Sequence, residues 1–156
     1  MRKINKIVMH CSDSDFGNVN IIRKWHLARK FNDIGYHYVI LSGFINVNFE
    51  RKILNGSIEC GRFEDIVGAH VEGNNSDSIG ICLIGANRFT KEQFFSLKLL
   101  ILELCEVYSL TEEDVFGHYE LDKRGKTCPN IDMDILRDFI FGNNDLLSLH
   151  EYLKGI

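Results

Sequence analysis

The sequence predicts an α/β fold, in which a single domain holds a mixed central β-sheet flanked by helices. Strand-like and helix-like apolar patterns alternate along the first half of the chain, as is typical of helices packed on a sheet. Asn55-Gly56 is the strongest short-range signal for a two-residue hairpin turn, because both residue types tolerate a positive φ. A hairpin joins antiparallel strands, so the sheet is expected to be mixed rather than all parallel.

The size and composition fit one domain of this kind. A chain of 156 residues is long enough to bury a substantial core. The hydrophobic fraction of 45% and the charged fraction of 26% are ordinary for a soluble globular protein. We therefore expect residues 1–156 to form one domain, with residues 143–156 as a C-terminal helical extension.

The first strand and the first helix are expected near the N-terminus. Residues 4–11 (INKIVMHC) read as a strand that ends in the core. Apolar side chains recur at helical spacing in IIRKWHLARKF, which predicts a helix over residues 20–31. Asn18 or Asn20 can cap its N-terminus, since asparagine side chains accept from free backbone amides there.

A second strand and a hairpin are expected next. Residues 35–41 (GYHYVIL) are rich in β-branched and aromatic side chains. In a regular strand Tyr36 and Tyr38 would share one face and His37 would point to the other. This placement favours His37 as a packed or supporting residue rather than a metal ligand. Residues 49–62, which include Asn55-Gly56, are expected to form a hairpin.

The middle of the chain predicts a buried strand followed by a long helix. Residues 79–85 (IGICLIG) are almost continuously apolar, as expected for a central strand covered on both faces. Thr90 followed by Gln93 forms the pattern of a capping box, which opens a helix that extends to about Tyr108.

The last third predicts one short strand and two helices. Residues 114–118 (DVFGH) are expected to be a short strand, and Asp132 can cap a helix over residues 133–141. Residues 146–154 (LLSLHEYLK) predict a further helix.

Several classes of protein are disfavoured by charge and patterning. A formal net charge of −4 offers no basic surface for nucleic acid, and no apolar run is long enough to span a bilayer. The N-terminal apolar run IVM is too short for a signal peptide, so we expect synthesis in the cytoplasm without one. The five cysteines form no even framework, which indicates reduced thiols.

The stretch GHYELDKRGKTCPNID at 117–132 carries the strongest chemical signal. It places His118, Lys126 and Cys128 close together, and imidazole and thiolate are preferred zinc ligands. Cys128 lies in a polar loop rather than an apolar run, which makes simple burial a weaker explanation for it. A catalytic zinc keeps three protein ligands, and His10 is the best candidate for the third. By spacing alone, histidines and cysteines at such separations are more often ordinary core or surface residues than metal ligands.

Taken together, six motifs resemble one known family. The chain is similar to the zinc-dependent N-acetylmuramoyl-L-alanine amidases of the phage T7 lysozyme and peptidoglycan-recognition-protein type, from about Ile7 to Met133. The same motifs occur here in the same order, namely VMHCS (8–12), IRKWH (22–26), DIGYHYVI (33–40), GSIECGR (56–62), VGAHVEGNNSDSIGICLIG (67–85) and GHYELDKRGKTCPNID (117–132).

The resemblance implies a metal centre and a reaction. Matched position by position, it implies that zinc is bound by His10, His118 and Cys128. Recognition proteins of the family that lack activity also lack the ligand cysteine, so the presence of Cys128 favours an enzyme. The implied reaction is hydrolysis of the amide between N-acetylmuramic acid and the first L-alanine of the peptidoglycan stem peptide.

The resemblance also implies roles for four further residues. It implies that Tyr36 and Lys126 are catalytic, and that His70 and Asn75 line the substrate groove. A lysine ammonium can stabilise the oxyanion formed by attack on the amide, and a tyrosine hydroxyl can hydrogen-bond the water or that oxyanion. Without the resemblance, a loop lysine and a strand tyrosine would be taken as solvated and packed side chains.

Other interpretations stay open at the level of sequence. The same fold could serve as a peptidoglycan-binding or partner-regulating protein, such as a polymerase inhibitor, and a purely structural zinc would need a fourth protein ligand. The segment 41–55 is longer than the family's usual hairpin, and is either an extended arm or a flap over the groove. A lysis enzyme, a wall-recycling enzyme and a toxin are all consistent, as is a stem peptide with diaminopimelate or lysine.

Overall fold

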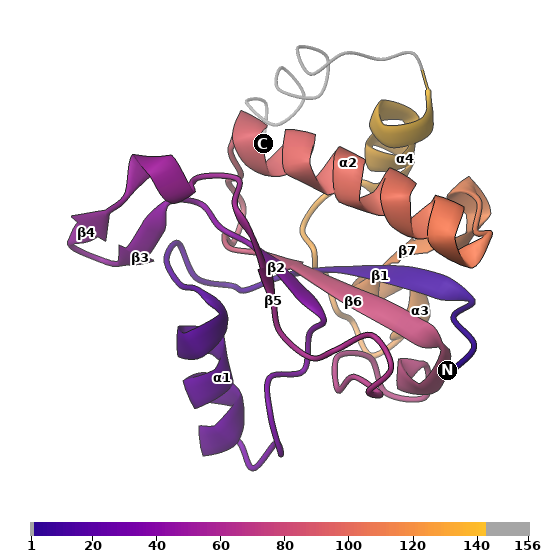
Figure 1. Ribbon diagram of the computed structural model, residues 1–156, viewed down its shortest axis with the longest axis horizontal. Coiled ribbons are helices and arrows are strands. Elements are labelled where there is room, and N and C mark those ends of the chain that lie inside the picture. Colours follow the sequence, from indigo (N-terminus) through magenta and orange to yellow (C-terminus); the bar gives the residue numbers. More distant parts are fainter. Residues whose placement is uncertain (1, 143–156) are drawn as a thin grey trace.

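The centre of the computed structural model is a five-stranded mixed sheet with the order β5-β2-β6-β1-β7 (Figure 1). Its strands are β1 (Lys6–Cys11), β2 (Tyr38–Ile40), β5 (Ile58–Cys60), β6 (Ser78–Leu83) and β7 (Val115–Gly117). Strand β5 pairs antiparallel with β2, and the other neighbours are parallel. The expected mixed sheet is therefore confirmed. The structure describes residues 2–142, so the extension expected at 143–156, with its helix at 146–154, lies outside the described residues.

Helices cover both faces of this sheet (Figure 1). Helices α2 (Lys91–Tyr108) and α4 (Met133–Phe141) pack on one face, and α1 (Val19–Ala28) packs on the other. A short helix, α3 (His118–Leu121), follows directly on β7. Among the described residues, no helix is both long and apolar enough to cross a membrane.

Alternation along β1 and β6 separates an apolar face from a face that carries polar groups. Ile7, Met9, Ile79, Ile81 and Leu83 point into the core beneath α2 and α4. Their neighbours in β1 and β6 point to the opposite face because successive strand side chains alternate. The register pairs His10 with Cys82, Val8 with Gly80 and Lys6 with Ser78. These residues form the surface on which the candidate site is built.

Two elements match their sequence signals closely. All six residues of β6 are buried, as the apolar run predicted for a central strand. Helix α2 begins with the expected capping box between Thr90 and Gln93. The Gln93 side chain also donates to the carbonyls of Ile40 (3.0 Å) and Ile84 (2.8 Å), which ties the helix start to β2 and the end of β6.

The helix at 133–141 is confirmed, and the first helix is shorter than predicted. Asp132 caps α4 by accepting from the amides of Asp134 and Ile135. Asn18 caps α1, which starts at Val19 and ends at Ala28 rather than at residue 31. Lys30 has a φ of +66°, which no α-helix can contain, so the chain leaves the helix before Phe31.

The hairpin expected over residues 49–62 is wrong. Asn55 has a φ of −62° and a ψ of 126°, and Gly56 has a φ of +79°, which is a type II turn rather than a hairpin turn. The real hairpin joins β3 (Phe44–Asn46) to β4 (Phe49–Glu50), and the 3-10 turn η1 (Lys52–Leu54) follows it. The segment 41–55 therefore contains an extended arm, closed at its base by the Arg51 amide on the Gly43 carbonyl (2.7 Å).

The prediction that Tyr36 and Tyr38 share a face is also wrong. Tyr38 packs against the core beneath α2, whereas Tyr36 packs with the α1 cluster on the other face. The regular strand begins only at Tyr38, so alternation does not extend back to Tyr36. Gly35 closely approaches the Ala69 backbone, where a Cβ would lie 2.3 Å from the carbonyl oxygen, and this contact bends the segment away from an extended path.

Candidate metal centre and active site

Three side chains from distant parts of the chain meet at the carboxyl end of β1. One potential ligand atom from each of His10, His118 and Cys128 lies within 4.8 Å of the others. His10 Nδ1 is 3.8 Å from Cys128 Sγ, and the rings of His10 and His118 are 4.8 Å apart. A tetrahedral zinc would place nitrogen and sulfur ligands about 3.6 Å apart. The arrangement therefore fits a zinc ion with three protein ligands.

Backbone hydrogen bonds hold the cysteine in place. The amide of Cys11 donates to Cys128 Sγ at 3.2 Å, and the amide of Tyr119 donates to the Cys128 carbonyl at 3.0 Å. Asn130 donates to the Ala86 carbonyl at 2.8 Å, which fixes the other end of the loop. The neighbouring Cys11 thiol and burial raise the pKa of the Cys128 thiol, so a thiolate here needs a cation beside it.

A carboxylate orients His118. Its Nε2 lies 3.4 Å from Asp122 Oδ2, four residues further along the chain, which leaves Nδ1 free. Asp122 is itself held by Arg124, whose Nε donates to Oδ1 at 2.8 Å, and Arg124 also contacts Glu72 at 2.7 Å. Histidines that bind metals commonly donate their second nitrogen to a carboxylate in this way.

A second histidine lies against His10. Nε2 of His10 is 3.0 Å from Nδ1 of His70, so the Nδ1 of His10 is the nitrogen that faces Cys128. The residues His10 and His70 are 1% and 8% exposed. Burial lowers the pKa of both imidazoles well below its ordinary value, which keeps them neutral. A neutral imidazole is the form that binds a metal.

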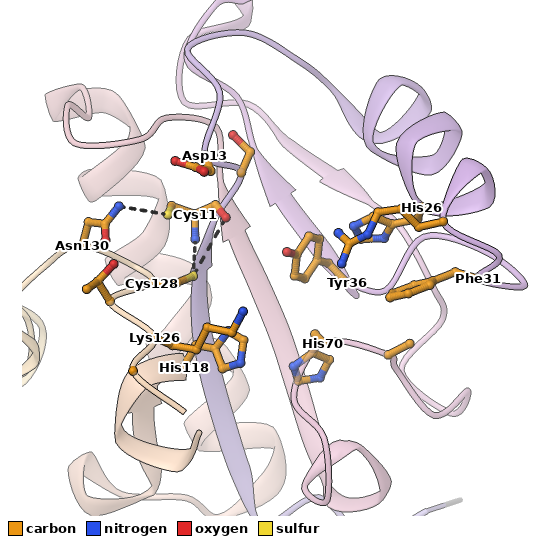
Figure 2. Close-up of a pocket in the computed structure, with 15 residues that line it drawn as sticks. Cys11, Asp13, His26, Phe31, Tyr36, His70, His118, Lys126, Cys128 and Asn130 are labelled. Carbon is orange, nitrogen blue, oxygen red and sulfur yellow. Dashed lines mark hydrogen bonds between the residues drawn. The ribbon is translucent and has the colours of Figure 1, made fainter. Parts of the chain in front are cut away.

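A cavity of about 390 Å³ opens over this centre. Figure 2 shows Tyr36, His26 and Phe31 along one side, with Lys126 and Cys128 along the other. The Tyr36 ring lies 5.0 Å from the His10 ring. Burial raises the pKa of the Tyr36 hydroxyl well above its ordinary value, so the phenol keeps its proton and can donate. Lys126 is exposed on the facing loop.

The cavity and the group of potential metal ligands together account for six of the seven predicted site residues: five line the cavity, and His10 belongs to the ligand group. Asn75 is the exception, since it does not line the cavity and its Oδ1 accepts from the amides of His70 (2.8 Å) and Val71 (2.9 Å). His70 lines the cavity, but both of its ring nitrogens face protein atoms. A substrate-contacting role for these two residues stays a prediction.

Two other buried histidines make hydrogen bonds near the site, and one of them, His37, is the residue expected to pack or support it. His26 Nδ1 accepts from the Gly35 amide at 2.8 Å, and His37 Nδ1 accepts from the Gly80 amide at 2.9 Å. His37 Nε2 lies 3.0 Å from the Ile66 carbonyl, to which it donates. Neither histidine is among the three potential metal ligands, and the supporting role expected for His37 stays a prediction.

Sequence reasoning missed several residues at the site. Arg29, Phe31 and Asn130 line the cavity, and the Arg29 guanidinium lies 5.3 Å from the Phe31 ring centroid. Asp122 was missed as the partner of His118, although a spacing of four residues would have indicated it had the short helix α3 been recognised.

The fold and the site together define an α/β protein in which two histidines and one cysteine, grouped as potential metal ligands, lie at the base of an open cavity. Comparisons with known proteins agree. The family model described as N-acetylmuramoyl-L-alanine amidase matches residues 1–131. The chain is 34% identical to an endolysin of Klebsiella phage KP32 over 144 residues, covering 85% of this chain and 84% of that protein. It is also 34% identical to the endolysin of Escherichia phage T7, covering 81% of each.

Solved structures show the same architecture. The N-acetylmuramoyl-L-alanine amidase LysC from Clostridium intestinale superposes with a TM-score of 0.73 at 28% identity, covering 87% of this chain and 84% of that one. Drosophila PGRP-LB shares the fold, with a TM-score of 0.68 at 22% identity over 93% of this chain and 87% of its own. The chain belongs to the N-acetylmuramoyl-L-alanine amidase family.

Proposed function

We propose that this chain uses a zinc ion held by His10, His118 and Cys128 to hydrolyse the amide bond between N-acetylmuramic acid and L-alanine in peptidoglycan. The observation that carries the proposal is the convergence of two imidazoles and one thiol at the base of an open cavity. Three protein ligands leave a coordination position for water, as catalytic zinc sites require. Membership of the amidase family and the endolysin relatives support the reaction.

The ion would supply Lewis-acid activation of a water molecule and of the amide carbonyl when bound. The remaining chemistry falls to side chains on the two sides of the cavity. Tyr36 keeps its proton, so it donates a hydrogen bond to the attacking water or to the carbonyl oxygen as charge develops. Lys126 approaches from the facing loop, where its ammonium stabilises the same developing negative charge.

The surroundings of the centre suit this chemistry. His10 is almost fully buried, which shields it from water. Lys126 and Thr127 are exposed and line the cavity. A substrate amide can therefore enter from solvent and meet a partly desolvated centre, where electrostatic stabilisation is stronger than in water. As an endolysin-like amidase, the protein would act on the cell wall once it is released or delivered there.

Mass spectrometry of digested peptidoglycan tests the proposal. Addition of one water across the bond should release stem peptides with a free L-alanine amino group and leave the lactyl carboxylate on the glycan. The digest also reports whether the third stem residue is diaminopimelate or lysine. Cys60→Ala is a matched control, because this exposed thiol lies away from the cavity. New reducing sugar ends or cut cross-links, with the muramoyl amide intact, would contradict the assignment.

A further inference from the structure

A line of buried polar groups connects His10 to the start of β6. His10 is followed by His70 at 3.0 Å, by Ser78 Oγ at 3.4 Å from His70 Nε2, and by the Asn74 carbonyl at 2.6 Å from Ser78 Oγ. His10 and Ser78 lie on the same face of the adjacent strands β1 and β6. All three side chains are buried, so each polar atom depends on its neighbours rather than on water.

The number of protons on each group determines which atom donates and which accepts in each hydrogen bond of this line. The Ser78 hydroxyl has one proton, and the shorter contact shows that it is donated to the Asn74 carbonyl. Ser78 Oγ can then only accept from His70, so the proton of neutral His70 is on Nε2. His70 Nδ1 is left as an acceptor, and His10 Nε2 must donate to it. The lone pair of His10 Nδ1 is thereby directed towards Cys128.

The backbone makes room for His70 in this one position. A Cβ at Gly80 or at Gly68 would lie 2.6 Å from ring atoms of His70, so only glycine fits at either side of the ring. The amide of His70 is held by Asn75. The ring is therefore fixed by its packing, its backbone and both of its nitrogens, and little rotation is open to it.

We propose that His70 is a positioning residue for His10, and that Ser78 sets the tautomer of both histidines so that His10 presents an unprotonated Nδ1 to the metal. The proposal rests on the proposed function in one respect, namely that His10 is a metal ligand. It assigns to His70 a task different from the substrate contact that the family resemblance implies. It also gives Asn75 a task, because Asn75 holds the His70 backbone.

Zinc affinity distinguishes this task from simple packing. His70→Leu removes the acceptor for His10, and loss of such a partner weakens metal binding about 10–100-fold. His70→Gln keeps an acceptor oxygen and a donor group, so its zinc affinity should stay closer to wild type. Ser78→Ala removes only the last acceptor and should have a smaller effect, about tenfold. Ser76→Ala is the matched control, because Ser76 is exposed two residues away.

Nitrogen NMR of the zinc-loaded protein tests the tautomers directly. In histidine-labelled wild type at pH 7, both His10 and His70 should carry their proton on Nε2. In the zinc-free form, where no metal holds the proton of His10 on Nε2, Ser78→Ala should lose this preference at His70, which a loss of packing alone would not cause. A proton on Nδ1 of His70 in the wild type would overturn the proposal.

Zinc dissociation constants, measured by competition with a chromophoric chelator, complete the test. Wild-type zinc affinity in folded His70→Leu would also overturn the proposal. If that variant does not fold, wild-type zinc affinity in Ser78→Ala would overturn it instead. Failure of the wild type to bind zinc would sink the proposed function as well. A zinc-bound wild type with unchanged variants would sink the positioning role alone.

Discussion

His10 and His118, the two proposed histidine ligands, lie near the same cysteine but are oriented by different means. His10 is 1% exposed and rests on the neutral chain of His70 and Ser78. The His118 side chain is 15% exposed and rests on Asp122, which is paired with the largely exposed Arg124. We call His10, His70 and Ser78 the strand side, and His118, Asp122 and Arg124 the loop side.

The difference follows from burial. A charged partner for His10 would have to be desolvated completely, which costs several kcal/mol per ion. On the loop side the guanidinium of Arg124 stays in water, so a carboxylate can orient His118 without that penalty. The strand side thus orients its ligand by hydrogen bonds alone, whereas the loop side also uses charge.

Cys128 Sγ lies within 4.8 Å of a ring nitrogen of each histidine, so its replacement should have the largest effect on both. Cys128→Ala should abolish stoichiometric zinc binding and activity together, because two imidazoles alone make a weak site. The measurement is elemental analysis of the purified variant alongside a wall-digestion assay. One zinc per chain in Cys128→Ala would show that the ligand set is wrong.

One catalytic candidate lies on each side of the cavity, which allows a matched comparison. Tyr36→Phe and Lys126→Ala should each keep zinc but lose about 10²–10³ in rate, as loss of one oxyanion donor does in other hydrolases. Lys123→Ala, an exposed lysine three residues before Lys126, is the control. Turnover at the wild-type rate in either catalytic variant would remove that residue from the mechanism.

Changes on the loop side should be graded by exposure. Asp122→Asn removes the charged partner of His118 and should weaken zinc binding about 10-fold or more. Arg124→Ala should weaken it only a few-fold, because a pair with an exposed partner contributes about 1 kcal/mol or less. Added salt should reduce the Arg124 effect. Equal losses in the two variants would mean that Arg124, rather than Asp122, controls the loop.

A change in pH tests the two buried histidines that lie outside both sides, His26 and His37. Burial lowers the pKa of His26 and of His37 to about 4, and each Nδ1 already accepts from a backbone amide. Histidine in the unfolded chain has a pKa near 6.5. Between pH 6.5 and 4 these two histidines are therefore protonated in the unfolded state but neutral in the folded state. The free energy of unfolding should therefore decrease as the pH is lowered through this window. The loss at pH 5 should be on the order of 1–2 kcal/mol per histidine.

The measurement is urea unfolding of the chelator-treated protein at pH 7 and pH 5, so that metal binding does not contribute. Most carboxylates titrate below this range, since their ordinary pKa lies near 4. An unchanged unfolding midpoint would show that these histidines accept protons in the folded state.

Sequence patterns correctly predicted the parts of the structure that are determined by residues close together in the chain. The capping box of α2, the cap of α4 and the buried run of β6 each depend on residues a few positions apart. The ligand set was implied by the matched motifs, since spacing alone left His10 and Cys128 as ordinary residues.

Predictions were wrong where distant contacts decide the conformation. Asn55 donates to Glu92 and accepts from Thr90, and this anchor accompanies a type II turn in place of a hairpin turn. Tyr36 leaves the expected face because Gly35 meets Ala69. The partnership of His10 with His70 spans 60 residues and leaves no local pattern. Nearby sequence could not show any of these contacts.

The separation of His10 from Cys128 has a consequence for protein synthesis. The Cys11 amide and its Cys128 partner are 117 residues apart, and β1 pairs only with β6 and β7 in the described sheet. At about 5–20 residues per second, roughly 6–23 s pass on the ribosome between the two halves of the site. A nascent chain that has not reached residue 128 therefore carries His10 but lacks the proposed cysteine ligand. The zinc-dependent activity proposed above cannot begin before that residue has been translated.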